Sequence, residues 1–302
     1  MAVIYPRKFK SAMGAMSARD VLTQVVRDRE IHHITLNRYR FSEQRSCKDL
    51  TDLIEQLDGK PVELVRDLSR HVSDEARHAM WLTDLLVDIG SSVGTPPGSS
   101  YIEEFERLLD REQATPEQGD DFIISSMAAI NVTEKRGCEY FSAHIHALKQ
   151  APQTEENIKI RETIERILPE EAGHVRWGTR FLAKMAEKSL EHREKVNQAK
   201  AKYAAIEQAA FESGMDFTAG AELRRVSSLL DIANTLPLWQ RPQYLAERLP
   251  QSLLAPDLQM TRIDVAQRAW QRDPQAFMER FVPMFLGGLN RQPTAQGAEK
   301  KA

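Results

Sequence analysis

The sequence has few of the features that mark several large classes of protein. It holds only two cysteines, Cys47 and Cys138, in 302 residues, so it has no disulfide framework and no paired-cysteine zinc motif. No apolar run approaches the roughly 20 residues of a membrane span, and the first residues lack the apolar block of an export signal. Lysine and arginine (41) nearly balance aspartate and glutamate (44). We therefore expect a cytoplasmic protein that binds neither membranes nor nucleic acid.

The alternating pattern of β-strands is also missing, and helical periodicity dominates, which predicts an all-α fold. We expect helices over residues 17–57, 61–89, 101–112, 121–150 and 155–190, the last interrupted by Pro169. This order of hairpin, connection and hairpin is typical of a four-helix bundle with one long crossover. We assign residues 1–16 to an N-terminal extension, 17–190 to the bundle, 191–289 to additional C-terminal helices and 290–302 to a disordered tail.

Two of the expected helices carry the same motif, Glu-Ala-x-His-x-x-Trp. A glutamate and a histidine three residues apart lie on one face of a helix and can bind one metal ion. A single copy would be a weak signal, because glutamate is common in helices. The two copies are Glu75, His78 and Trp81 in one helix and Glu171, His174 and Trp177 in the other.

The remaining two long helices share a second motif, Glu-x-Arg-x-Cys, which begins at Glu43 and at Glu134. The chain therefore contains an internal repeat of a helical hairpin. Folding each hairpin at its turn brings Glu43 level with Glu75 and Glu134 level with Glu171. Both Glu43 and Glu134 lie on apolar helix faces, where a carboxylate must be neutralised or must bind an ion.

Four carboxylates and two imidazoles that face one core predict a dinuclear metal site. Four negative charges balance two divalent cations, and mixed carboxylate and imidazole ligands suit iron or manganese better than zinc. The predicted ligands are Glu43, Glu75, His78, Glu134, Glu171 and His174.

On these residues, the segment 17–190 resembles the ferritin-like superfamily of carboxylate-bridged di-iron proteins. The resemblance implies that Glu75 and Glu171 bridge the two metal ions and that Glu43 and Glu134 are terminal ligands. The run from Asp74 to His78 is also similar to a signature of bacterial di-iron monooxygenase hydroxylases. The second copy departs from that signature, because Glu170 and Gly173 replace the aspartate and the arginine, so only the superfamily is assigned.

Further residues are candidates for supporting roles. His71 precedes Glu75 by four residues, and we interpret it as a hydrogen-bonded core histidine, with a third histidine ligand as the alternative. Asp74, Arg77 and Glu170 are candidates for contacts behind the ligands. Candidates for a pocket, a radical or electron transfer, for which ordinary packing is the alternative, are Tyr39, Cys47, Cys138, Trp81 and Trp177.

The resemblance implies an enzyme, an O2-dependent di-iron oxidoreductase of the non-haem type. We expect a monooxygenase or oxidase that uses two iron ions, or one manganese and one iron, and O2 as co-substrate to hydroxylate, N-oxygenate, desaturate or cleave a small organic substrate. The chain has no glycine-rich dinucleotide motif, so we expect an external electron donor such as a reductase or ferredoxin. A homodimer is one possible assembly of the chain. The alternative is a ferroxidase, another iron-handling protein or a peroxide-scavenging ferritin-like protein.

Overall fold

The computed structural model describes residues 17–96, 101–112, 118–214, 226, 229–253, 263, 266–268, 270–275 and 277–279. Among these residues none lies in a β-strand, which confirms the prediction of an all-α fold. None of the helices in the described ranges is both long enough and apolar enough to cross a membrane. The helices are α1 (Ala18–Val25), α2 (Arg29–Gln56), α3 (Val62–Asp88), α4 (Tyr101–Glu112), α5 (Gly119–Gln150), α6 (Glu155–Glu187), α7 (Leu190–Gly214) and α9 (Arg241–Ser252).

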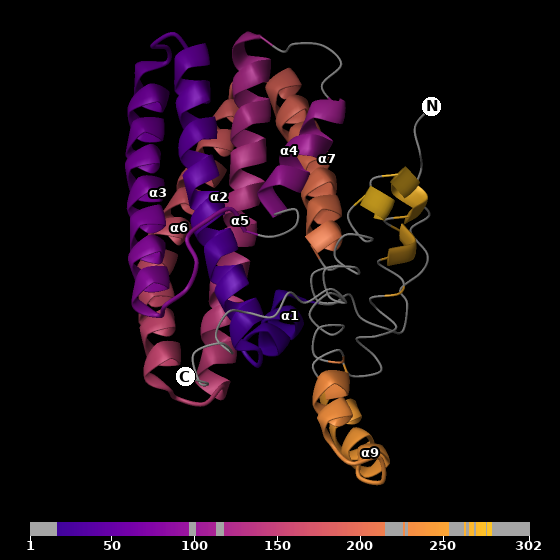
Figure 1. The fold of residues 1–302 in the computed structure, drawn as a ribbon. Helices are drawn as coiled ribbons and strands as arrows, with labels where there is room; N and C mark the ends of the chain where they lie inside the picture. Colours follow the sequence, from indigo (N-terminus) through magenta and orange to yellow (C-terminus); the bar gives the residue numbers. More distant parts are fainter. Residues whose placement is uncertain are drawn as a thin grey trace. The chain divides into compact units, whose positions relative to one another are not determined.

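Four long helices form two hairpins that pack against each other (Figure 1). Helix α2 pairs with α3, α5 pairs with α6, and α3 also contacts α6. Helix α4 lies in the connection between the hairpins and packs on α7, which in turn packs on α5 and α6. The compact unit formed in this way runs from Ala18 to Gly214, so it includes α7, which lies beyond the boundary at residue 190 expected from the sequence.

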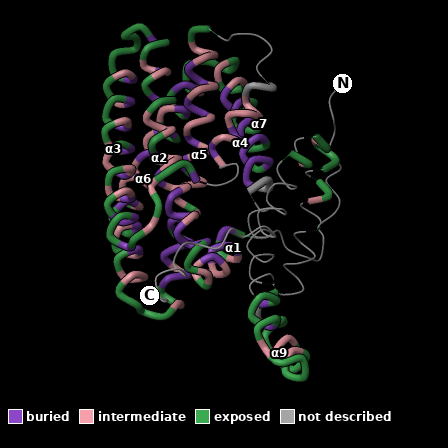
Figure 2. The backbone as a smooth tube through the Cα atoms, viewed as in Figure 1, coloured by how far each residue is buried: buried purple, intermediate pink, exposed green. Residues whose placement is uncertain are grey.

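The second compact unit comprises residues 1–17 and 215–302. Its main described element is α9, whose residues are mostly exposed (Figure 2). The expected N-terminal extension (1–16) and disordered tail (290–302) lie outside the described residues.

The expected single helix over residues 17–57 is wrong, because α1 ends at Val25 and α2 begins at Arg29. Asp28 stands between them with extended backbone angles (φ −123°, ψ 110°), and its side chain accepts a hydrogen bond from the Ile31 amide. Aspartate is a preferred N-cap residue, since its side chain satisfies an amide that has no partner within the helix. Asp28 therefore starts a new helix inside a stretch of continuous helical periodicity.

The expected interruption at Pro169 does not occur, because α6 continues through this residue from Glu155 to Glu187. Proline removes one backbone hydrogen bond, yet the buried face of α6 packs on both sides of it. The turn between α2 and α3 requires a glycine. Gly59 adopts a positive φ of 77° there, a conformation that favours glycine after a helix end.

Among the described residues of the unit formed by residues 18–214, two apolar clusters lie along the long helices with a polar layer between them. One cluster contains Leu50, Leu68, Met127 and Leu182, and the other contains Leu36, Leu82, Phe141 and Ile167. On each long helix, the predicted metal ligands fall in the sequence between its members of the two clusters. The buried residues of the long helices are drawn purple in Figure 2.

Helices α5 and α6 approach closely near this polar layer. The Asn131 Nδ2 atom donates a hydrogen bond to the Val175 carbonyl at 3.0 Å. Gly178 lies beneath this amide, and a Cβ atom added to it would stand 2.7 Å from Asn131 Nδ2. The absence of a side chain at Gly178 therefore makes room for a partly buried hydrogen bond between the two helices.

Candidate metal centre

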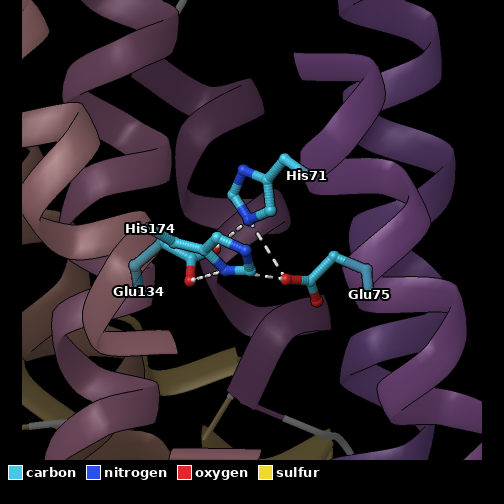
Figure 3. A group of neighbouring side chains, drawn as sticks. All are labelled: His71, Glu75, Glu134 and His174. Atoms are coloured by element: carbon cyan, nitrogen blue, oxygen red, sulfur yellow. Dashed lines mark hydrogen bonds and ion pairs between the residues drawn. The ribbon is translucent and has the colours of Figure 1, made fainter. Parts of the chain in front are cut away.

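Two glutamates and two histidines from α3, α5 and α6 converge in the polar layer (Figure 3). The His71 Nε2 atom lies 3.0 Å from a carboxylate oxygen of Glu75 and 3.2 Å from one of Glu134. The His174 Nδ1 atom lies 3.3 Å and 3.4 Å from oxygens of the same two carboxylates. The four side chains are buried and offer ligand atoms within 4.8 Å of one another, so they can hold one metal ion.

A second group of four lies beside the first and includes one residue of α2, Glu43. The His78 Nδ1 atom stands 2.8 Å from Glu171 Oε1 and 3.5 Å from Glu43 Oε2. Glu43, Glu75, His78 and Glu171 are buried and meet the same 4.8 Å criterion. Glu75 belongs to both groups, so the structure brings the six predicted ligands together around two adjoining positions.

His71 joins three of the six predicted ligands in the first group, as in the alternative of a third histidine ligand. Its ring centroid lies 3.8 Å from that of His174. Glu171, which the resemblance implies to be a bridging ligand like Glu75, belongs to the second group only. Its Oε2 atom nevertheless lies 3.9 Å from His174 Nδ1 in the first group.

The outer nitrogens of two histidines are held by carboxylates across the interface between α3 and α6. The His78 Nε2 atom lies 2.8 Å from Glu170 Oε2, and the His174 Nε2 atom lies 3.2 Å from Asp74 Oδ2. The Arg77 guanidinium donates hydrogen bonds to both carboxylates, at 2.6 Å to Asp74 and at 2.7 Å to Glu170. Such contacts orient ligand histidines and fix which nitrogen carries the proton.

Several atoms of the two groups test whether a metal ion fits. His78 Nδ1, His174 Nδ1, Glu134 Oε2 and Glu171 Oε1 are buried and make no hydrogen bond. Buried polar atoms without partners are rare in proteins and call for an explanation. These four atoms are metal-ligand types that lie in the two groups, so the donor set fits a pair of metal ions.

The pKa values of the side chains in the two groups reflect the close packing of several ionisable groups. Burial alone would lower the pKa of His78, but its close contacts with the Glu171 and Glu43 carboxylates raise it to about 11. Burial also opposes the charged form of His174, and contacts with Glu134 and Glu75 raise its pKa to about 12. Burial raises the pKa of Glu43 well above the ordinary value, and the neighbouring Glu75 charge adds to this. The histidines therefore carry the positive charge that balances the ionised carboxylates.

Comparison with known proteins gives a family but not an activity. A family model described as "Protein of unknown function (DUF455)" matches residues 38–227. The chain belongs to this family. No curated protein and no solved structure matches it. The matched residues include all seven side chains of the two groups, so the candidate metal centre lies wholly within the region that defines the family.

The remaining sequence candidates surround the two groups. Trp177 lies 6.1 Å from His71 between ring centroids, and Trp81 lies 5.8 Å from His78 in the same measure. Trp81 is also covered by the Arg166 guanidinium at 3.6 Å from the ring centroid. Trp81 therefore lies between the Arg166 guanidinium and the candidate ligand His78.

Both cysteines are half-buried near the carboxylates of the two groups. Burial and then the neighbouring carboxylates raise the pKa of Cys47 and of Cys138 to about 11, so both are neutral thiols at pH 7. Tyr39 packs edge-on against Phe141, with ring centroids 5.0 Å apart, and its buried hydroxyl makes no hydrogen bond.

Sequence reasoning missed what the arginines of the Glu-x-Arg-x-Cys motifs do. Arg45 binds Glu106 of α4 through two hydrogen bonds, and Arg136 binds Glu207 of α7 in the same bidentate manner. The repeat marked both arginines, but no local signal identifies partners 61 and 71 residues away.

It also missed a buried histidine pair on α2 and α5. The His32 Nε2 atom lies 2.8 Å from His144 Nε2. Burial and the charge of His33 lower the pKa of His32 to about 4, so the pair is neutral at pH 7. Histidines in a helical stretch carry no sequence signal that separates such a pair from surface residues.

Proposed function

We propose that this protein is a ferritin-like, di-iron, O2-dependent oxidoreductase that oxidises a small organic substrate. The observation that carries the proposal is the pair of buried four-residue groups joined by Glu75. Ligand sets of this size in a helical core are costly unless they bind ions, because each buried carboxylate loses its hydration.

The origin of the ligands supports membership of the ferritin-like superfamily. Helices α2 and α5 each contribute one glutamate, Glu43 and Glu134, while α3 and α6 each contribute a Glu-x-x-His pair. This is the ligand pattern of ferritin-like dinuclear proteins. The connection through α4 takes the place of the long crossover of that fold.

The charges support a pair of divalent ions. Four carboxylates neutralise two such ions, which makes a dry core tolerable for the loaded centre. Mixed carboxylate and imidazole ligands favour iron or manganese. Bound iron would supply the electrons that reduce O2, and an external reductase or ferredoxin would restore them.

The residues around the proposed centre orient the candidate ligands. Glu170 and Asp74 hold the outer nitrogens of His78 and His174, so that each Nδ1 atom is directed towards the ligand group. Arg77 ties the two carboxylates together and keeps them from turning towards the centre. The two apolar clusters that flank the polar layer keep water from it and favour an organic substrate over a mineral iron core.

The first experiment is a metal count on the full chain after anaerobic loading with Fe(II). We expect two iron ions per chain, and an oxidised absorption band that develops on exposure to O2. Glu75→Ala should lose both ions, because Glu75 serves both groups, whereas Glu156→Ala removes a carboxylate that binds Arg29 near the surface and should keep both. Two ions at full occupancy in Glu75→Ala would overturn the proposed centre.

The second experiment separates the reaction classes. An oxygenase consumes O2 in step with oxidation of an added organic compound and with electrons from a reductase. A shell-like oligomer that accumulates many iron ions per chain would favour iron storage instead. Consumption of hydrogen peroxide without an organic product would favour the peroxide-scavenging alternative.

A further inference from the structure

The two hairpins match at the predicted ligands but differ one helical turn before the Glu-x-x-His motif. His71 precedes Glu75 by four residues, whereas Ile167 precedes Glu171 by the same four. Ile167 is fully buried and belongs to an apolar cluster. The repeat therefore has an imidazole in one copy and a hydrocarbon side chain at the equivalent place in the other.

This difference changes the composition of one group only. His71 contacts Glu75 and Glu134 through Nε2, so the first group offers two imidazoles and two carboxylates. The second group offers one imidazole, from His78, and three carboxylates. We name the first group the nitrogen-rich position (His71, Glu75, Glu134 and His174) and the second the oxygen-rich position (Glu43, Glu75, His78 and Glu171).

His71 also differs from the other two histidines in what lies behind it. The outer nitrogens of His78 and His174 are held by carboxylates, whereas the outer nitrogen of His71, Nδ1, is buried and has no hydrogen-bond partner. His71 therefore adds a nitrogen ligand without adding another negative charge behind it. The two positions differ both in ligand type and in net charge.

Resting on the metal centre proposed above, we propose that His71 makes the two positions unequal, so that different metal ions sort between them. Imidazole suits zinc and iron, and carboxylate suits manganese. The nitrogen-rich position takes the imidazole-preferring ion and fills first. The oxygen-rich position takes manganese when both kinds of ion are present. The loaded centre is accordingly a mixed-metal pair under mixed supply.

The test uses the metal-free full chain, one equivalent of Zn(II) and then one equivalent of Mn(II). Anomalous diffraction at the zinc and manganese absorption edges locates each ion in the crystal. We expect zinc to favour the nitrogen-rich position by at least about tenfold, because changing even a residue behind a metal ligand typically alters affinity by 10- to 100-fold, and His71 is itself a candidate ligand. Equal zinc occupancy at the two positions in the unmodified protein would overturn the proposal, whatever the variants show.

Two matched substitutions use the repeat as its own control. His71→Ile gives both copies the isoleucine, and Ile167→His gives both copies the histidine. Each should bring the ratio of zinc occupancies at the two positions towards one. His71→Ile should also replace two binding steps by one in a calorimetric titration. A tenfold preference that survives in folded His71→Ile would contradict the role of His71.

The outcomes separate this inference from the metal centre itself. Binding of two ions without a preference would support the metal centre and contradict the role of His71. A protein that binds fewer than two ions per chain loses the centre on which both rest.

Discussion

The contact between α5 and α6 yields a sharp prediction about Gly178. In Gly178→Ala, the added Cβ would stand 2.7 Å from Asn131 Nδ2 and 3.3 Å from Asn131 Cβ and Cγ. Carbon atoms essentially never approach a side chain this closely, so the Asn131 amide must move. Its movement breaks the hydrogen bond to the Val175 carbonyl and leaves a buried amide without its partner.

The free-energy balance decides the sign. Overpacking costs about 1–3 kcal/mol, and the lost hydrogen bond costs about 1 kcal/mol. Alanine returns about 1 kcal/mol through its higher helix propensity. We expect a net loss of about 1–3 kcal/mol, which lowers Tm by roughly 2–12 °C for a unit of this size.

The matched control is Gly173→Ala on the same helix. The nearest atom to a Cβ at Gly173 is Arg176 Nη2 at 4.0 Å, an ordinary contact. Only the propensity gain of up to about 1 kcal/mol then remains, so this variant should be as stable as the original protein or more so. Urea unfolding of the metal-free protein measures both, which keeps metal binding out of the comparison.

A double substitution tests the cause. Asn131→Ala combined with Gly178→Ala removes the side chain that the new Cβ meets, so the double variant should lose less stability than the sum of the two single variants. A Gly178→Ala protein that is as stable as Gly173→Ala would refute the steric reasoning.

Three further outcomes follow from buried charge and from the proposed metal centre. Arg136→Gln should cost about 3–5 kcal/mol in urea unfolding, because it leaves the buried Glu207 unpaired, whereas Arg45→Gln, whose partner Glu106 is more exposed, should cost less than about 1 kcal/mol. The pKa of His32 is about 4 when folded and 6.5 when unfolded, so stability falls as pH drops from about 6.5 to 4, by up to about 1.4 kcal/mol per pH unit, and His32→Gln should reduce that slope. Removing metal from a sample held at about 1,000 times Kd should cost about 4 kcal/mol, which thermal unfolding with and without a chelator measures.

The sequence was sufficient to predict which side chains gather in the two buried groups, because their pattern is repeated. Glu75 and Glu171 begin the same motif in two helices, and each has a glutamate at its level on the paired helix. A Glu-x-x-His motif that occurs twice, each time opposite a glutamate on the paired helix, is less easily mistaken for a surface ion pair than a single copy is. The all-α class followed from periodicity that covers almost the whole chain.

Other features depend on contacts that local sequence does not record. The break at Asp28 has an N-cap residue, but the helical periodicity on both sides conceals it. His71 could be placed on the ligand face, yet its contact with Glu134 requires the second hairpin to be in position. The place of α7 within the first unit depends on packing against α5 and α6, which no motif before residue 190 signals.

The arginines of the Glu-x-Arg-x-Cys motifs connect the proposed metal centre to helices outside the core. Arg45 and Arg136 each follow a candidate ligand by two residues, which turns them about 200° around the helix from that glutamate. Each therefore reaches outward to a covering helix, Arg45 to α4 and Arg136 to α7. One turn of helix thus has a candidate metal-ligating carboxylate on its inner side and an anchor for the covering helix on its outer side. Slower amide hydrogen exchange in α4 and α7 on loading would report, at the periphery, whether the interior is filled.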